Sequence, residues 1–205
     1  MKNKAVVLAL SAMGFFASEA MAQQSPWLVR ARAVHINPAD KSDAVPALGL
    51  PANAISVSNK TIPEIDISYF FTPNIAAELI LTYPQKHDVY VTGLGNIGSF
   101  KHLPPTLSLQ YHFTPAAQIS PYVGAGINYT NISSVNLLNG AADFEHKSFG
   151  LALQVGADFK IDKHWSINLD VKKVQIRSDL LAGGAQIGHV KVDPVLVGLG
   201  IGYRY

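Results

Sequence analysis

Alternation of apolar and polar residues with a period of two is the feature that most constrains this chain. Over residues 149–161, Phe, Leu, Leu, Val, Ala, Phe and Ile occupy every second position, with Gly, Ala, Gln, Gly, Asp and Lys between them. Because successive side chains of a strand point to opposite faces, this pattern predicts strands with one apolar face. The pattern recurs along the chain, which predicts eight strands at about residues 27–37, 63–71, 75–83, 106–113, 121–130, 149–161, 165–172 and 192–205.

The segments between the predicted strands alternate strictly between short and long. The short ones are residues 72–74, 114–118 and 162–164, and the long ones are about 38–61, 84–104, 131–147 and 178–191. Outer-membrane barrels have short periplasmic turns and longer external loops, and tilted strands of about nine residues or more cross a bilayer. We therefore expect an all-β fold, an eight-stranded antiparallel transmembrane β-barrel with four extracellular loops and both termini in the periplasm.

The first 22 residues have the features of a secretory signal peptide. Lys2 and Lys4 precede an apolar run over residues 5–17, and Ala-Met-Ala at 20–22 matches the cleavage pattern. The run is too short to be a spanning helix. We expect a cleaved signal peptide at residues 1–22 and one barrel domain at residues 23–205. Cysteine is absent and the net charge is +2, so neither a disulfide framework nor a nucleic-acid partner is expected.

A soluble up-and-down barrel or sandwich would show the same alternation. In such a fold the polar face meets water and is rich in charge, whereas here it holds small residues such as Gly124, Gly126, Gly156 and Gly200. The chain also ends on an aromatic residue, Tyr205, after apolar residues at two-residue steps. This ending looks like the sorting signal that the barrel assembly machinery reads. Both features favour a barrel in the outer membrane of a Gram-negative bacterium, in contact with its lipid.

No enzyme, metal or cofactor site is expected. The nucleophile motif G-x-S-x-G does not occur in the sequence. Ser108 and His112 point inward on one predicted strand, but four residues separate them by about 13 Å, too far for a hydrogen bond. The histidines of the long loops show no spacing typical of metal ligands.

Several stretches resemble the OmpW family of outer-membrane proteins. They are HLPPTL at residues 102–107, PYVGAGINYT at 121–130, QVGAD at 154–158, Asp193-Pro194 and the Gly202-Tyr203-Arg204 ending. The stretch LSLQYH at 107–112 is close to the alkane-importer branch, AlkL. The resemblance covers essentially the whole mature chain and is weakest in the four loops. It implies a narrow, partly apolar barrel, here expected to be a monomer, that takes up small hydrophobic solutes and in some members releases them sideways through the wall.

The side chains that point inward decide whether anything passes, because an eight-stranded barrel is barely wide enough for its own side chains. An apolar ligand path is expected near the external end, formed by Val34, Ile36, Ile80 and Leu196. A charged floor is expected near the periplasmic end, formed by Arg30, Arg32, Glu78, His112, Asp158, Lys160 and Arg204. The charge pairs could instead be purely structural. The inward glycines would either leave space for a solute or only ease curvature and close packing.

Leu103, Pro104 and Pro105 mark the expected lateral gate. Proline lacks the N–H that a barrel wall needs, and in lipid an unpaired backbone group costs several kcal/mol. Two prolines near the external end of a strand would weaken its pairing and let an apolar molecule leave into the bilayer. The other interpretation is that they only end the strand at the membrane surface. The competing function is a structural or receptor barrel with a plugged lumen, whose role lies in surface binding, bacteriocin reception or stress response.

Overall fold

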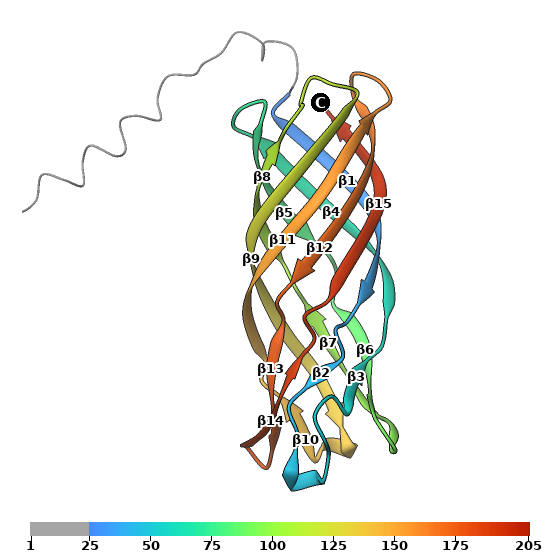
Figure 1. Cartoon of the computed structure of the whole chain (residues 1–205), viewed down its shortest axis with the longest axis vertical. Coiled ribbons are helices and arrows are strands. Elements are labelled where there is room, and N and C mark those ends of the chain that lie inside the picture. Colours follow the sequence, from blue (N-terminus) through green and yellow to red (C-terminus); the bar gives the residue numbers. More distant parts are fainter. Residues whose placement is uncertain (1–24) are drawn as a thin grey trace, which may run out of the picture.

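The computed structural model describes residues 25–205, in which eight strands hydrogen-bond in chain order into a closed wall (Figure 1). They are β1 (Trp27–Asn37), β4 (Lys60–Phe70), β5 (Ile75–Leu81), β8 (Thr106–His112), β9 (Ile119–Leu137), β11 (Lys147–Lys160), β12 (Trp165–Val174) and β15 (Val195–Arg204). β15 pairs antiparallel with β1 from Arg204↔Leu28 to Val195↔Asn37, which closes the barrel. The predicted eight-stranded antiparallel barrel is confirmed, and the predicted signal peptide lies outside the described residues.

The three short connections lie at one end of the barrel, here called the turn end. They cover residues 71–74, 113–118 and 161–164. The first and last described residues meet at this end, where the Ser25 amide donates to the Tyr205 carbonyl at 2.8 Å. The turn end is at the top of Figure 1, and the opposite end, with the long connections, is here called the loop end.

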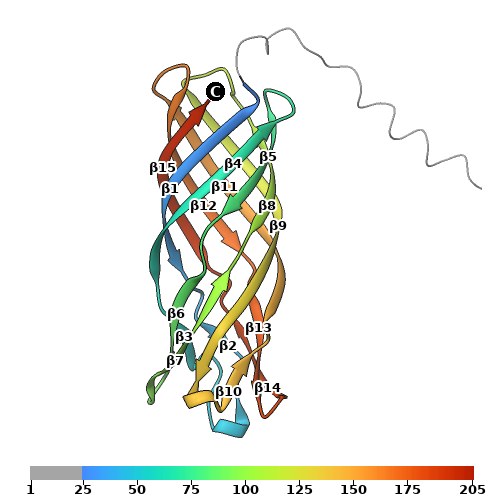
Figure 2. The same cartoon turned by 180° about the vertical axis from the view of Figure 1, so that it is seen from behind.

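The four long connections are not irregular loops but extend the wall beyond the eight strands (Figure 2). They contain two short 3-10 turns and the strands β2 (Lys41–Ser42), β3 (Ile55–Val57), β6 (Gln85–Val91), β7 (Gly95–Leu103), β10 (Ala142–Phe144), β13 (Arg177–Ala182) and β14 (Ala185–Lys191). β9 runs on to Leu137 and pairs there with β7. The sequence prediction of connections at 84–104 and 178–191 therefore missed two hairpins, whose turns use Gly93, Gly95, Gly183 and Gly184 at positive φ.

The two faces of the wall have opposite chemistry. Outward side chains at mid-height are apolar and exposed, such as Leu109, Leu153 and Leu199, whereas Arg30 and Glu78 inside are fully buried. Aromatic residues ring the outside near the turn end, at Trp27, Tyr69, Phe71, Tyr111, Phe113, Phe159, Trp165, Tyr203 and Tyr205, and farther toward the loop end, at Tyr83, Tyr129 and Phe149. A soluble barrel would have the reverse arrangement, so this arrangement is that of a barrel in lipid.

Helices do not contribute to the wall. Within residues 25–205, no helix is long and apolar enough to cross a membrane.

The inward glycines admit neighbouring side chains and backbone rather than a solute. A Cβ at Gly200 would lie 2.1 Å from the Ala31 carbonyl oxygen, and one at Gly156 would lie 2.5 Å from the Tyr122 ring. These distances are far shorter than any contact that real side chains make. The interpretation of the glycines as sites of close packing is therefore confirmed, and the open space that they would have left is occupied.

Leu109 tests the lipid-facing surface, because it is exposed on the outside of β8 and pairs with Ala125 near the middle of the wall. We expect Leu109→Lys to lower the free energy of unfolding by about 2–4 kcal/mol, since a charge at mid-membrane loses its hydration. Urea unfolding in lipid vesicles measures this difference. Leu94→Lys, at an exposed position in the β6–β7 turn, is the control and should leave stability within about 0.5 kcal/mol. Equal effects of the two substitutions would contradict a membrane at mid-height.

Candidate functional site

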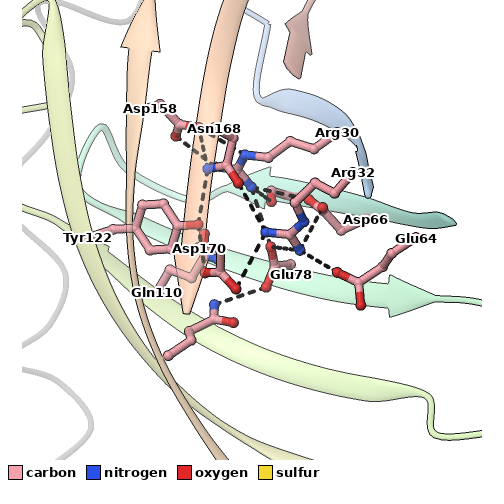
Figure 3. A network of polar contacts seen from close by, with 12 residues as sticks. Arg30, Arg32, Glu64, Asp66, Glu78, Gln110, Tyr122, Asp158, Asn168 and Asp170 are labelled. Atoms are coloured by element: carbon pink, nitrogen blue, oxygen red, sulfur yellow. Dashed lines mark hydrogen bonds and ion pairs between the residues drawn. The ribbon is translucent and has the colours of Figure 1, made fainter. Parts of the chain in front are cut away.

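A network of buried ion pairs crosses the barrel interior (Figure 3). The Arg30 guanidinium of β1 lies 3.2 Å from the Asp66 carboxylate, 3.4 Å from that of Glu78 and 2.7 Å from that of Asp158. These partners come from β4, β5 and β11, so one side chain ties together four strands of the wall. Arg30 itself is completely buried.

Arg32 lies one inward position farther toward the loop end and extends the network. Its guanidinium lies 2.9 Å from Glu64, 2.8 Å from Asp66 and 3.7 Å from Asp170. Lys172 of β12 closes the circuit, 3.4 Å from Glu64 and 3.6 Å from Asp170. We call this network the plug, and its members are Arg30, Arg32, Glu64, Asp66, Glu78, Asp158, Asp170 and Lys172.

Neutral donors add hydrogen bonds to the carboxylates, which outnumber the cations in the plug. The Tyr122 hydroxyl donates to Asp170 at 2.9 Å, and Asn168 Nδ2 donates to Asp158 at 2.9 Å. Buried charges are tolerated when each is paired and its remaining lone pairs are satisfied. The plug is therefore a network of buried, mostly paired charges that crosses the barrel interior, in which Asp66 Oδ2 and Arg32 Nε have no hydrogen-bond partner among residues 25–205.

The predicted floor residues divide into two groups. Arg30, Arg32, Glu78 and Asp158 meet in the plug. The other three, His112, Lys160 and Arg204, make none of its ion pairs and line a cavity of about 40 Å³ at the turn end, whose lining also includes Asp158 of the plug.

Each of those three residues has its own contact at the turn end. His112 Nε2 lies 3.2 Å from Gln110 Oε1, Lys160 Nζ donates to the Pro115 carbonyl, and the Arg204 guanidinium lies 4.1 Å from the centre of the Phe70 ring. Asp158 belongs to both groups, so the charged side chains predicted from the sequence continue from the plug toward the turn end.

Sequence reasoning missed half of the plug, namely Glu64, Asp66, Asp170 and Lys172. The signal was present, because all four occupy polar positions of strands that were predicted. What one sequence does not provide is the register between neighbouring strands, which determines the height at which each inward side chain lies.

A small apolar cavity borders the plug on its loop-end side, and we call it the lower cavity. Its volume is about 30 Å³, and Glu64 and Lys172 of the plug form part of its lining. The predicted path residues Ile36, Ile80 and Leu196 also line it. The fourth predicted path residue, Val34, packs with Ile36 and Ile62 in the same apolar cluster, with Leu196 against it.

A larger apolar cavity lies among the hairpins at the loop end. We call it the upper cavity, although Figure 1 draws the loop end at the bottom. Its volume is about 250 Å³, and its lining includes Ile55, Val89, Leu137, Phe144 and Leu180. A dry cavity of about 150 Å³ is enough to hold benzene, so this one has room for a small apolar molecule.

The buried side chain of Phe100 lies between the two cavities. Its ring lies 5.3 Å from that of Phe144 in the lining of the upper cavity and 5.9 Å from that of His102 in the lining of the lower cavity.

The wall is interrupted beside the lower cavity, where β5 gives way to β6. β5 pairs with β8 as far as Ile80↔Thr106. Pairing resumes between β6 and β7 at Gln85↔His102, with the register shifted by one residue. Residues 82–84 therefore lie outside the strand ladder on this side.

The opposite edge of the same segment is also unpaired. β4 pairs with β5 as far as Ile65↔Leu81, and the next backbone bond toward the loop end runs from the Ser58 amide to the Asp88 carbonyl at 3.0 Å. Within residues 25–205, no backbone–backbone hydrogen bond joins residues 82–84 to either neighbour. We call residues 82–84 the weak segment, because neither of its edges is held by backbone hydrogen bonds.

Pro104 and Pro105 lie beside the weak segment, but their other edge is secured. The Tyr129 amide of β9 donates to the Pro105 carbonyl at 3.1 Å. The Asn128 side chain donates to the carbonyls of Pro104 and Pro105, each at 3.2 Å. Pro104 also lines the lower cavity together with Thr82 of the weak segment. Pro104 thus interrupts the wall toward β5 and β6, whereas the backbone of Pro105 faces β9 and is bonded there.

Metal-ligand geometry is not found in the described part of the chain. Among residues 25–205, no group of three or more His, Cys, Asp or Glu side chains is arranged to hold a metal ion.

Comparison with known proteins places this geometry in a family. The sequence profile of the OmpW family matches residues 23–205. The uncharacterized outer-membrane protein y4mB of Sinorhizobium fredii is 43% identical over 188 residues, which cover 88% of this chain and 80% of that protein. The dibenzothiophene metabolism operon protein PahQ of Pseudomonas aeruginosa is 27% identical over 200 residues, 92% of this chain and 93% of that protein.

Solved structures agree with the sequence matches. The crystal structure of OprG from Pseudomonas aeruginosa superposes with a TM-score of 0.77 at 25% identity, covering 89% of this chain and 97% of that one. The solid-state NMR structure of AlkL in lipid bilayers gives a TM-score of 0.71 at 25% identity, covering 93% and 95%. This protein is an outer-membrane β-barrel whose loop end faces the exterior, and it belongs to the OmpW family.

Proposed function

We propose that this protein is a passive channel that admits small apolar molecules from the exterior and releases them sideways through its wall, rather than an enzyme. The observation that carries the proposal is the order of features along the barrel. From the loop end inward come the apolar upper cavity, the lower cavity with the weak wall segment beside it, and then the plug.

The upper cavity favours an apolar solute. Its lining is formed by aliphatic and aromatic side chains such as Leu50, Val91 and Phe144. A polar solute would lose its hydration there without gaining hydrogen bonds. The name of the relative PahQ links it to metabolism of dibenzothiophene, a flat apolar heterocycle, which is consistent with this class of solute.

The plug directs the solute away from the straight route. A molecule in the lower cavity faces the buried charges of Glu64 and Lys172 in one direction. In the other it faces Thr82 and Pro104, which lie next to Tyr83 of the outer aromatic ring and so at the outer edge of the bilayer. Because residues 82–84 lack ladder hydrogen bonds, moving them breaks fewer backbone bonds than opening the wall elsewhere. The sideways exit beside Leu103, Pro104 and Pro105 is thus the route of lower cost.

The plug also favours the competing function, a closed structural or receptor barrel. A barrel that needs only to hold a surface site benefits from an interior that is filled and paired, and the ordered hairpins at the loop end offer such a surface. A receptor does not require an apolar cavity next to an interruption of the wall. Uptake measurements therefore separate the two functions.

The chain end supports the expected route of assembly. β15 places apolar residues outward at two-residue steps, and exposed Tyr205 follows it at the turn end. We propose that the barrel assembly machinery reads this strand and that the barrel works as a monomer in outer-membrane lipid.

Arg30 tests the plug. We expect Arg30→Met to lower the free energy of unfolding by about 3–5 kcal/mol, because it leaves the carboxylates of Asp66, Glu78 and Asp158 buried without their shared cation. Urea unfolding in lipid vesicles measures the change. Arg177→Met is the matched control, since Arg177 pairs with Asp193 at the surface and its loss should cost about 1 kcal/mol or less. Similar costs for the two variants would mean that the plug is not a stabilising unit.

Pro104 and Pro105 test the exit. We expect the double replacement of both prolines with Thr to slow uptake of octane severalfold, because the N–H restored at position 104 faces the weak segment and can bond to one of its carbonyls, which closes the wall. Uptake is measured in cells that produce the protein, and heat-modifiable migration on gels shows that the barrel has folded. Pro73→Thr, in the turn at residues 71–74, is the control. Unchanged uptake in the double variant would contradict the lateral gate.

A further inference from the structure

Three buried polar side chains interrupt the apolar lining between the two cavities. Gln85 and His87 point inward from β6, and His102 points inward from β7 directly opposite Gln85. Each is at least 98% buried. The same inward face of β6 continues toward the loop end with Val89 and Val91, which line the upper cavity.

Each of the three side chains has one buried polar atom without a hydrogen-bond partner among residues 25–205. These atoms are Gln85 Oε1, His87 Nε2 and His102 Nδ1. The two imidazole rings are stacked, with their centres 4.8 Å apart and their planes within 9°. Buried polar groups are nearly always paired, so three unpaired ones in neighbouring positions point to a bound partner.

The hydrogen bonds that these side chains do make determine what the free atoms can do. His87 Nδ1 lies 2.7 Å from the Ser58 carbonyl, which can only accept, so Nδ1 carries the proton and Nε2 is left as an acceptor. Gln85 Nε2 donates to the Tyr83 carbonyl at 2.8 Å, which leaves Oε1 as an acceptor as well. Gln85 Oε1 and His87 Nε2 are therefore both acceptors that lack a hydrogen-bond donor.

The imidazole rings stay neutral at ordinary pH. Both lie beyond the outer aromatic ring of Tyr83 and Tyr129, in the part of the barrel outside the membrane. Burial lowers the pKa of His87, and burial together with the neighbouring His87 lowers the pKa of His102 to about 3. A carboxylate partner is not favoured by neutral rings, whereas a hydroxyl group is a suitable donor.

We propose that Gln85, His87 and His102 form a head-group station that binds the hydroxyl of an apolar molecule with a single polar end, such as a medium-chain alcohol. The tail lies toward the upper cavity, since Val89 is about 13 Å along β6 from Gln85. The hydroxyl donates to Gln85 Oε1 or His87 Nε2, and His102 Nδ1 completes its surroundings. This inference rests on the proposed function and adds to it a preference for alcohols among small apolar molecules of similar size.

The choice of probes isolates the hydroxyl. 1-Octanol and 1-methoxyheptane have the same atoms and similar shape, but the ether has no donor, and nonane has no polar end at all. Protein labelled with ¹⁵N-histidine is titrated with each probe in lipid nanodiscs at pH 7.5. We expect 1-octanol to shift the imidazole resonances of His87 and His102, and the ether and nonane to leave them in place. His35, which lies on the outside of β1, reports on partition into lipid.

Uptake by cells provides the second measurement. We expect 1-octanol uptake above the level of cells without the protein to exceed that of the ether about fivefold, the advantage of one hydrogen bond of ordinary strength. Gln85→Met and His87→Phe remove the acceptors and should abolish this advantage while nonane uptake stays the same. His35→Phe makes the matched change outside the lumen and should have no effect.

The outcomes separate this inference from the proposed function. If nonane uptake is no higher than in cells without the protein, the proposed function as a channel for apolar molecules is wrong. If nonane enters but the alcohol and the ether shift the two histidines alike, or the advantage survives in Gln85→Met and His87→Phe, the station is overturned. If one variant fails to fold, the other variant and the histidine resonances of the unmodified protein still decide.

Discussion

The structure depends on one constraint, that every backbone N–H and C=O group in the membrane must be paired inside the wall. The ladder between β1 and β15 meets this constraint by closing the sheet on itself. Closure with eight strands then determines the width of the interior, which side chains alone can fill. This narrow space explains why glycines face inward beside bulky side chains such as Tyr122. It also explains why Arg30 and Arg32 lie so close to the carboxylates with which they pair.

This constraint is relaxed at residues 82–84. Residues 82–84 leave both neighbouring ladders just where Pro104 provides no N–H on the adjacent strand. Asn128 meanwhile satisfies the carbonyls of both prolines on their other edge. The edge of the prolines toward β9 is held by several hydrogen bonds, whereas the edge toward residues 82–84 is not. This difference indicates that the interruption is a specific feature of the wall on one side.

Much of this architecture was predictable from the sequence because period-two alternation is a local property. It identified the strands, the inward and outward faces, and the alternation of short and long connections. The inward positions of Arg30 and Asp158 followed from the same pattern. Their contact did not, because it depends on the register between strands and on how the wall closes. For the same reason Asp170 was not recognised as a partner of Arg32, and Lys172 was not recognised as a member of the plug.

The loop end was the part least accessible to sequence reasoning, and it carries most of the functional interest. The sequence of residues 85–91 has four polar residues followed by three apolar ones, so no period-two pattern marked a strand there. In the folded barrel burial does alternate, with Gln85 and His87 turned inward and Lys86 between them turned outward. An inward polar residue beyond the membrane is not needed to seal the lumen, because the plug already does so closer to the turn end. Its burial among apolar neighbours therefore has to be explained by what passes it, which makes this short stretch of β6 the place where selectivity can be separated from stability.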